Sequence, residues 1–92
     1  MTKIKVSQLI WDTWNKEHIK KHNVTIAEVE EGIKKVNAHR KGYSGRIILI
    51  GSARTRILAI LVSPKENKKY YLVTVRDADK KERRLLYDNE EK

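Results

Sequence analysis

The chain has 92 residues, enough for one domain and too few for a second hydrophobic core. It contains no cysteine, which excludes a disulfide framework and a thiolate metal site and fits a reducing cytosol. No apolar run approaches the ~20 residues of a membrane helix, and no segment has the pattern of a signal peptide. We therefore expect one soluble cytoplasmic domain over residues 1–92, with no membrane contact.

The formal net charge is +9, and the basic residues are unevenly distributed. Residues 34–56 carry seven lysines and arginines and no acid, whereas residues 24–33 carry three glutamates and no base. Such a block is typical of a polyanion-binding surface, although a generally basic solvated surface is the alternative. Arginines at strand positions favour phosphate recognition. The seven residues are Lys34, Lys35, Arg40, Lys41, Arg46, Arg54 and Arg56.

The first third of the chain predicts an arm and two helices. The segment from Lys3 to Ile10 leans apolar, as in a strand or an extended arm. Asp12 can cap a first helix that runs to about His22, and Asn23 suits the left-handed position that ends a helix. A second helix begins at Thr25, where TIAE forms a capping box and apolar residues recur every three or four positions.

The first helix carries aromatic rings along one face. Trp11, Trp14, His18 and His22 are spaced three and four apart. Two histidines four apart can bind a metal, but no third ligand is evident. We therefore expect histidines packed by tryptophan, and neither a metal nor a cofactor.

A loop and three strands follow the second helix. The segment from Val36 to Gly45 is rich in glycine and basic residues, which indicates a loop and a candidate phosphate contact. Strands are predicted for Arg46–Ile50, Arg56–Val62 and Tyr70–Val75. The short turns between them require antiparallel neighbours, hence a meander. The run ILAILV is apolar on both faces, as in a central strand.

Each predicted strand begins or ends at an arginine. Because side chains alternate between the faces of a strand, each guanidinium shares a face with apolar neighbours at the rim of the sheet. The groupings are Arg46 with Ile48 and Ile50, Arg56 with Leu58 and Ile60, and Arg76 with Thr74 and Leu72.

The last strand runs into a third helix. Asp79 can cap this helix, with Glu82 completing a capping box, and the helix then presents Arg83 and Tyr87. An arginine, a carboxylate and a phenol at a strand-to-helix corner can bind a phosphate and move a proton beside it. The alternative is a solvated charged helix held by its own ion pairs.

The order WDTWNKEHIKKHNVT, AEVEEG, GRIILIG, RILAILV and YYLVTVRDADKKERRLLY resembles BrnT-type toxins of bacterial and archaeal type II toxin–antitoxin systems. The resemblance covers about Ile10 to Tyr87. It implies a RelE-like α+β fold with two N-terminal helices, a three- to four-stranded antiparallel sheet and a C-terminal helix. It also implies mRNA as substrate, no obligate metal and a cognate, BrnA-like antitoxin as partner.

The resemblance also implies a set of site residues. A metal-free ribonuclease needs a base for the 2′-OH proton, an acid for the leaving 5′ oxygen and cations around the phosphorane. Glu82 is the candidate base, unless capping is its only role, and the acid is Tyr87, His18 or His22. The catalytic set is Arg46, Arg56, Arg76, Glu82, Arg83 and Tyr87. The RNA-binding set is Lys34, Lys35, Arg40, Lys41, Arg54, His18 and His22.

The hypothesis is therefore a metal-independent endoribonuclease toxin that cleaves mRNA through 2′-OH attack. A basic nucleic-acid-binding module without catalysis and a protein that mainly binds its antitoxin are the alternatives. The hypothesis requires Arg46, Arg56 and Arg76 to converge with the last helix on one pocket.

Overall fold

The computed structural model describes residues 6 and 8–90, with the side chains of the last helix described as far as Leu85. In this part of the chain no helix is both long enough and apolar enough to cross a membrane. The elements in chain order are β1 (Gln8–Ile10), α1 (Thr13–Lys20), α2 (Ile26–Lys34), β2 (Val36–Lys41), a 3₁₀ turn (Tyr43–Gly45), β3 (Ile47–Ala53), β4 (Arg56–Pro64), a second 3₁₀ turn (Glu66–Lys68), β5 (Lys69–Asp77) and α3 (Lys80–Glu90).

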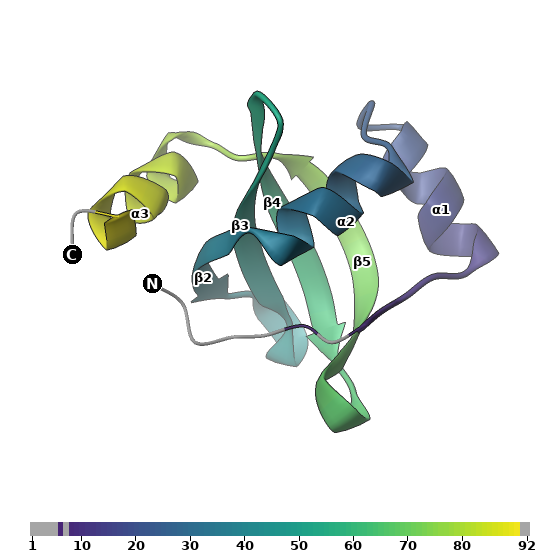
Figure 1. Cartoon of the computed structure of the whole chain (residues 1–92). Coiled ribbons are helices and arrows are strands. Elements are labelled where there is room, and N and C mark those ends of the chain that lie inside the picture. Colours follow the sequence, from purple (N-terminus) through teal and green to yellow (C-terminus); the bar gives the residue numbers. More distant parts are fainter. Residues whose placement is uncertain (1–5, 7, 91–92) are drawn as a thin grey trace.

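The five strands form one mixed sheet in the order β1-β5-β4-β3-β2 (Figure 1). The predicted meander of three antiparallel strands is confirmed as β3, β4 and β5, and the ILAILV segment lies in the central strand. Strand β2 pairs antiparallel with β3, so that β2 to β5 form an antiparallel sheet of four strands, as expected. The expectation is wrong at the other edge, where β1 adds a fifth strand parallel to β5.

Strand β2 corrects the predicted loop from Val36 to Gly45. Its residues pair with β3 from Val36 opposite Gly51 to Lys41 opposite Ile47, with one irregularity after Val36. Ala38 is buried against Ile50, which anchors this otherwise polar strand to the sheet. The pairing satisfies backbone groups that a loop would have to expose to water.

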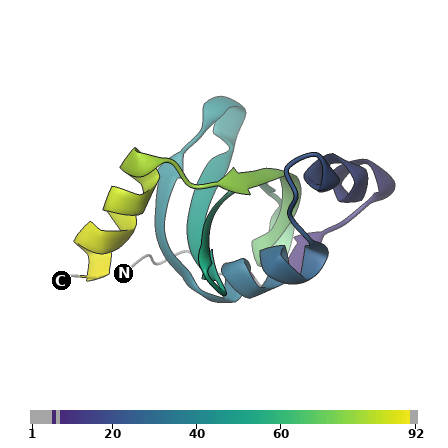
Figure 2. The same cartoon turned by 90° about the horizontal axis from the view of Figure 1, so that it is seen from above.

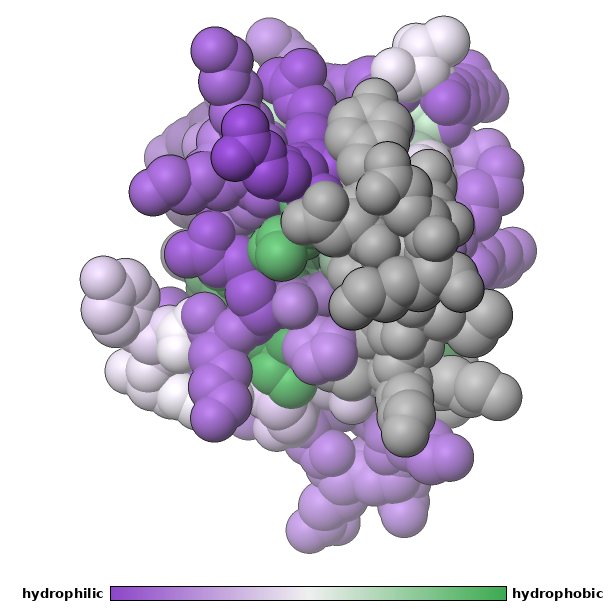
Figure 3. Space-filling view, turned by 90° about the vertical axis from the view of Figure 1, so that its left-hand side faces the viewer, coloured by the Kyte–Doolittle hydropathy of each residue, from purple (hydrophilic) through white to green (hydrophobic). Residues whose placement is uncertain are grey.

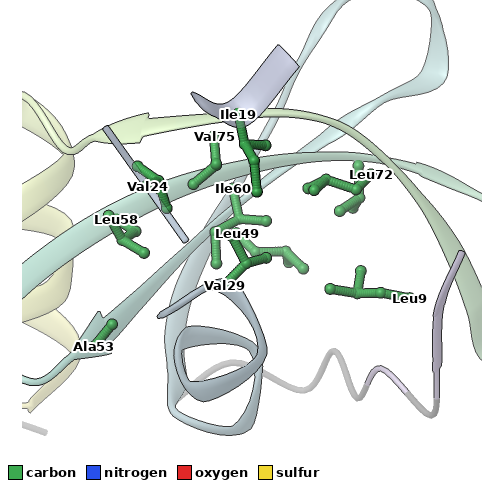
Figure 4. Packing of buried hydrophobic residues seen from close by; sticks show 11 residues of the cluster. Leu9, Ile19, Val24, Val29, Leu49, Ala53, Leu58, Ile60, Leu72 and Val75 are labelled. Atoms are coloured by element: carbon green, nitrogen blue, oxygen red, sulfur yellow. The ribbon is translucent and has the colours of Figure 1, made fainter. Parts of the chain in front are cut away.

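Helices cover both faces of the curved sheet. Helices α1 and α2 lie on one face, and α3 lies on the other (Figure 2). The main core fills the space between α1, α2 and the sheet, and most of its residues are labelled in Figure 4. A smaller cluster under α3 consists of Ala38, Ile50, Ile57 and Leu85.

Two glycines allow α2 to lie close to the sheet. A Cβ atom on Gly51 of β3 would stand 2.2 Å from the carbonyl oxygen of Gly32 in α2, a separation that real atoms do not adopt. A Cβ on Gly32 would stand 3.1 Å from Cδ1 of Ile60. The helix and the strand therefore meet backbone to backbone.

The helix signals of the sequence are confirmed. Asp12 and Thr25 cap α1 and α2, each within a capping box, and Asn23 takes the left-handed conformation with φ of 56°. The partner that completes the box at Asp12 is Asn15. Helix α1 ends at Lys20, one short turn before the expected His22.

Asn15 joins α1 to the two strands at one edge of the sheet. Its side chain is fully buried, and its amide nitrogen donates to the carbonyl oxygens of Ile10 and Leu72, both at 3.0 Å. Its amide oxygen accepts from the backbone N–H of Asp12 at 2.9 Å. One side chain thus holds β1, β5 and the start of α1 together.

Replacing Asn15 by alanine is expected to destabilise the fold. The substitution leaves buried carbonyl oxygens without donors, which costs about 2–3 kcal/mol of the free energy of unfolding. Urea unfolding followed by circular dichroism measures this loss. Lys16→Ala, on the exposed side of the same helix, serves as the control and should change the stability by less than about 0.5 kcal/mol. A loss of the same size in both variants would contradict the role given to Asn15.

Candidate nucleic-acid interface

Strand pairing places two predicted cations on the face of the sheet that carries α3. Residues opposite each other in antiparallel strands point to the same face. The register therefore gives two rows of side chains across this face. The first row is Arg40, Ile48, Leu61 and Thr74, and the second is Ala38, Ile50, Ala59 and Arg76.

A bulge in β5 sets the direction of Arg76. Thr74 pairs with Leu61 but Leu72 pairs with Val62, so Val73 is the additional residue. Leu72 consequently joins Val75 in the main core, while Arg76 shares the α3 face with Thr74. The expectation that Arg76 and Leu72 share a face was wrong, because strict alternation does not continue through a bulge.

The connection between β2 and β3 forms a pocket of about 290 Å³, which we call the basic pocket. Half-buried Ile48 and Leu61, paired across β3 and β4, contribute its apolar part. No acidic residue is among those that line it, and the predicted grouping of Arg46 with Ile48 is confirmed. Seen from the α3 side, the described surface is mainly hydrophilic with small hydrophobic areas (Figure 3). The lining residues are Arg40, Lys41, Gly42, Tyr43, Arg46, Ile48 and Leu61.

Arg76 and Glu82 form a paired contact where β5 passes into α3. The two terminal nitrogens of Arg76 donate to the two carboxylate oxygens of Glu82 at 2.7 and 2.9 Å. Glu82 is fully buried and completes the capping box with Asp79, at 2.9 and 2.8 Å. Hydrogen bonding to Glu82 raises the pKa of the Arg76 guanidinium. Both oxygens of Glu82 are thus occupied away from solvent, which matches the capping alternative and leaves Glu82 without an accessible oxygen to act as a base.

Asp79 lies at the start of α3, where a backbone N–H and the charges of two arginines lower the pKa of its carboxyl. Hydrogen bonding from the backbone N–H of Glu82 is the main cause that lowers the pKa of the Asp79 carboxyl, and the charges of Arg76 and Arg40 lower it further. Arg40 is three strands away from Arg76 in the sheet order. The strand register places Arg40 and Arg76 on the same face of the sheet, and their effect on the Asp79 carboxylate agrees with this placement.

Arg56 lies apart from this group. It lies on the same face of β4 as Leu58 and Ile60, as predicted, and those two residues belong to the core under α1 and α2. Its guanidinium donates to the carbonyl oxygen of Asn23 at 2.8 Å, to Glu28 at 3.2 Å and to Asp77 at 3.0 Å. Arg56 is thus held between α2 and the end of β5, while Arg76 is bonded to Glu82 and does not line the basic pocket with Arg46. The expected convergence of the three arginines on one pocket is therefore wrong.

Arg83 lies beside Arg56 at the end of the sheet. The two arginines line a second pocket, of about 280 Å³, which also includes the carboxylate residue Asp77. The Nε atom of Arg83 donates to the carbonyl oxygen of Ala78 at 3.1 Å. Tyr87 belongs to α3, but its side chain lies outside the described residues.

The other predicted RNA contacts are dispersed. His18 stacks on exposed Trp14 at 4.7 Å between ring centroids and meets His22 edge-on at 5.7 Å, all from α1. Trp11 precedes that helix and donates to Glu30 instead.

Lys34 and Lys35 end α2, where Lys35 lies 4.0 Å from Glu31. Arg54 lines a pocket with Glu28 and Glu31. Arg40 and Lys41 are the members of that set that line the basic pocket.

Tyr43 was not among the residues that the sequence predicted to contact RNA. It lines the basic pocket and is 90% exposed. The available signal was an aromatic residue within a glycine-containing segment bounded by Lys41 and Arg46. An aromatic ring between cations is the composition of single-stranded nucleic-acid sites.

Removing the charge of Arg40 is expected to raise the pKa of the Asp79 carboxyl. In the folded protein the attraction of Arg40 favours the ionised form and so holds this pKa below its ordinary value of 3.8. A carboxyl with a lowered pKa contributes stability above pH 3.8, and this contribution disappears as the pH falls through the lowered value. An NMR titration of Asp79 in Arg40→Ala checks the shift. Lys65→Ala, in the turn between β4 and β5, should leave the titration unchanged, and an unchanged Asp79 in Arg40→Ala would contradict the placement.

Replacing Glu82 by alanine is expected to lower the free energy of unfolding by about 2–3 kcal/mol. The variant removes the cap of α3 and the partner of Arg76, whose side chain is 44% exposed and can recover part of its hydration. Chemical unfolding measures the effect. Glu66→Ala, in an exposed turn, is the matched control, and equal stability of the two variants would show that the pair does not anchor α3.

Comparison with known proteins identifies a relative of the fold. No family model and no curated protein matches the sequence. The chain superposes on the crystal structure of the Brucella abortus ribonuclease toxin BrnT with a TM-score of 0.62 and 21% sequence identity. The match covers 79% of this chain and 97% of the other. The three helices and the five-stranded mixed sheet of the described residues therefore have a BrnT-like fold.

Proposed function

We propose that the chain is an endoribonuclease toxin of a toxin–antitoxin pair, cleaving mRNA without a metal ion. The observation that supports this most directly is the basic pocket, lined by three cations and no acid, on the same face as Arg76. A surface of this kind attracts the phosphate backbone. The fold shared with a ribonuclease toxin adds the reaction type to the proposal.

In the proposed reaction the 2′-OH attacks the adjacent phosphorus, and the bond from phosphorus to the 5′ oxygen breaks. The products carry a 2′,3′-cyclic phosphate and a 5′-OH. Negative charge gathers on the phosphoryl oxygens in the transition state, where positioned cations stabilise it most. We assign this role to Arg40 and Arg46, which line the basic pocket, and not to Arg76, which is bonded to Glu82.

The proton transfers are assigned by position. His18 and His22 belong to α1, whose Ile19 packs in the core on the face opposite α3. Glu82 is buried and bonded to Arg76. Tyr87 remains the proposed acid, because it belongs to α3 on the same face as the basic pocket.

The cognate partner in this proposal is an antitoxin protein that neutralises the toxin. Growth arrest on expression of this chain, relieved by co-expression of a neighbouring small gene, would support it.

One observation favours a second candidate, a nucleic-acid-binding module that does not cleave. The carboxylate expected to act as the base is occupied on both oxygens. If no other group accepts the 2′-OH proton, the basic pocket binds RNA and leaves it intact. Such binding would weaken steeply with salt, because its energy comes mainly from counterion release.

Cleavage of a single-stranded RNA in excess EDTA tests the proposal. We expect cutting by the native protein, 2′,3′-cyclic phosphate ends, and no reaction when the ribose carries 2′-O-methyl groups. Arg46→Ala should reduce the rate by about 100-fold, because one of the cations around the phosphorane is lost.

Lys65→Ala, which removes a cation from the β4–β5 turn, outside the residues that line the basic pocket, is the matched control and should cleave at the native rate. Salt-dependent binding by a fully folded native protein, with no cleavage in EDTA, would reject the metal-free ribonuclease and support the binding module. No difference between Arg46→Ala and Lys65→Ala would move the site away from the basic pocket.

A further inference from the structure

The basic pocket combines two kinds of surface. Three basic residues, Arg40, Lys41 and Arg46, line it together with the apolar pair Ile48 and Leu61. A site for phosphate alone needs only the cations. An apolar surface between cations indicates a ligand that has both a flat uncharged part and anionic groups.

Tyr43 stands at the tip of the β2–β3 connection beside this surface. It is 90% exposed, and an exposed ring buries no apolar area that would stabilise the fold. The backbone of the turn is nevertheless fixed. The N–H of Gly42 donates to the carbonyl oxygen of Arg46 at 2.8 Å, and the N–H of Arg46 donates to that of Tyr43 at 3.0 Å.

The conformation of this turn supports the same interpretation. Ser44 and Gly45 both take left-handed conformations, with φ of 57° and 76°. These bonds and angles form a tight turn from Gly42 to Arg46, so the backbone that carries Tyr43 has a defined conformation. A ring held in this way loses little conformational freedom when a flat ligand stacks on it.

We propose that the basic pocket is a subsite for one unpaired nucleotide of the RNA, whose base stacks on Tyr43 and contacts Ile48 and Leu61. The adjacent phosphates bind Arg40 and Arg46. This inference rests on the proposed function for the identity of the ligand, and adds that the site selects single strands. In a duplex the faces of the bases are covered by their neighbours, so the ring has nothing to stack on.

Fluorescence anisotropy with a labelled 12-nucleotide RNA, alone and annealed to its complement, tests the subsite. The native protein should bind the single strand at least about fivefold more tightly than the duplex. Tyr43→Ala should weaken single-strand binding by about tenfold, because stacking on one base is lost. Duplex affinity and the salt dependence of binding should stay at the native values, since no cation is removed.

Three variants separate the ring from other effects. Tyr43→Phe retains the stacking surface and should bind the single strand like the native protein. Ser44→Ala changes the same turn without touching the ring and should also bind normally. Arg46→Ala removes a cation, so it should weaken both RNAs and reduce the salt dependence. Circular dichroism should give Tyr43→Ala the unfolding midpoint of the native protein.

The outcomes distinguish this inference from the function on which it rests. Equal single-strand affinity of Tyr43→Ala and the native protein, or equal native affinity for single strand and duplex, would overturn the nucleotide subsite while leaving RNA cleavage intact. Selective, Tyr43-dependent binding without any cleavage would overturn the ribonuclease and retain the subsite. Absence of RNA binding by the folded native protein would overturn both.

Discussion

The contact between Arg76 and Glu82 fixes the position of α3 on the sheet, and with it the part of the sheet on which basic side chains remain exposed. It joins the last residues of β5 to the first turn of α3 through two hydrogen bonds, and the carboxylate is completely buried. Removing Arg76 would leave the buried carboxylate of Glu82 without its cation, whereas removing Glu82 would leave an arginine whose side chain is 44% exposed and can recover part of its hydration. The pair therefore fixes α3 over the second row of the sheet and leaves the first row beside the basic pocket.

The arginines of the sheet differ in what surrounds them. Arg56 and Arg76 are each bonded to carboxylates, so much of their field is cancelled at short range. Arg40 and Arg46 line a pocket whose lining contains no acid, and there the field of the cations adds. Strand position gave Arg46, Arg56 and Arg76 the same prediction, and Arg40 was placed in a loop. The carboxylates that the fold supplies separate Arg56 and Arg76, which hold elements together, from Arg40 and Arg46, which line the basic pocket.

The features predicted correctly from the sequence are those that depend on residues close together along the chain. The capping boxes at Thr25 and Asp79 depend on residues three positions apart, and both are present. Strand alternation placed Arg46 and Arg56 correctly but failed at the bulge near Val73, which depends on pairing with β4. Strand β2 was missed because its polar sequence carries one buried residue, Ala38. The parallel pairing of β1 with β5 joins segments about 60 residues apart and has no local signature.

The predicted site was partly correct for a related reason. A charge run in the sequence identifies cations but not their counterions, which come from other elements. Glu28 on α2 reaches Arg56 on β4, a pairing that spacing along the chain does not indicate. Glu82 illustrates the same point for an acid. Its residue type suits a general base, but the sequence does not show that Arg76 and the capping box bury its carboxylate. If the protein cleaves RNA, the group that accepts the 2′-OH proton must therefore lie outside this buried pair.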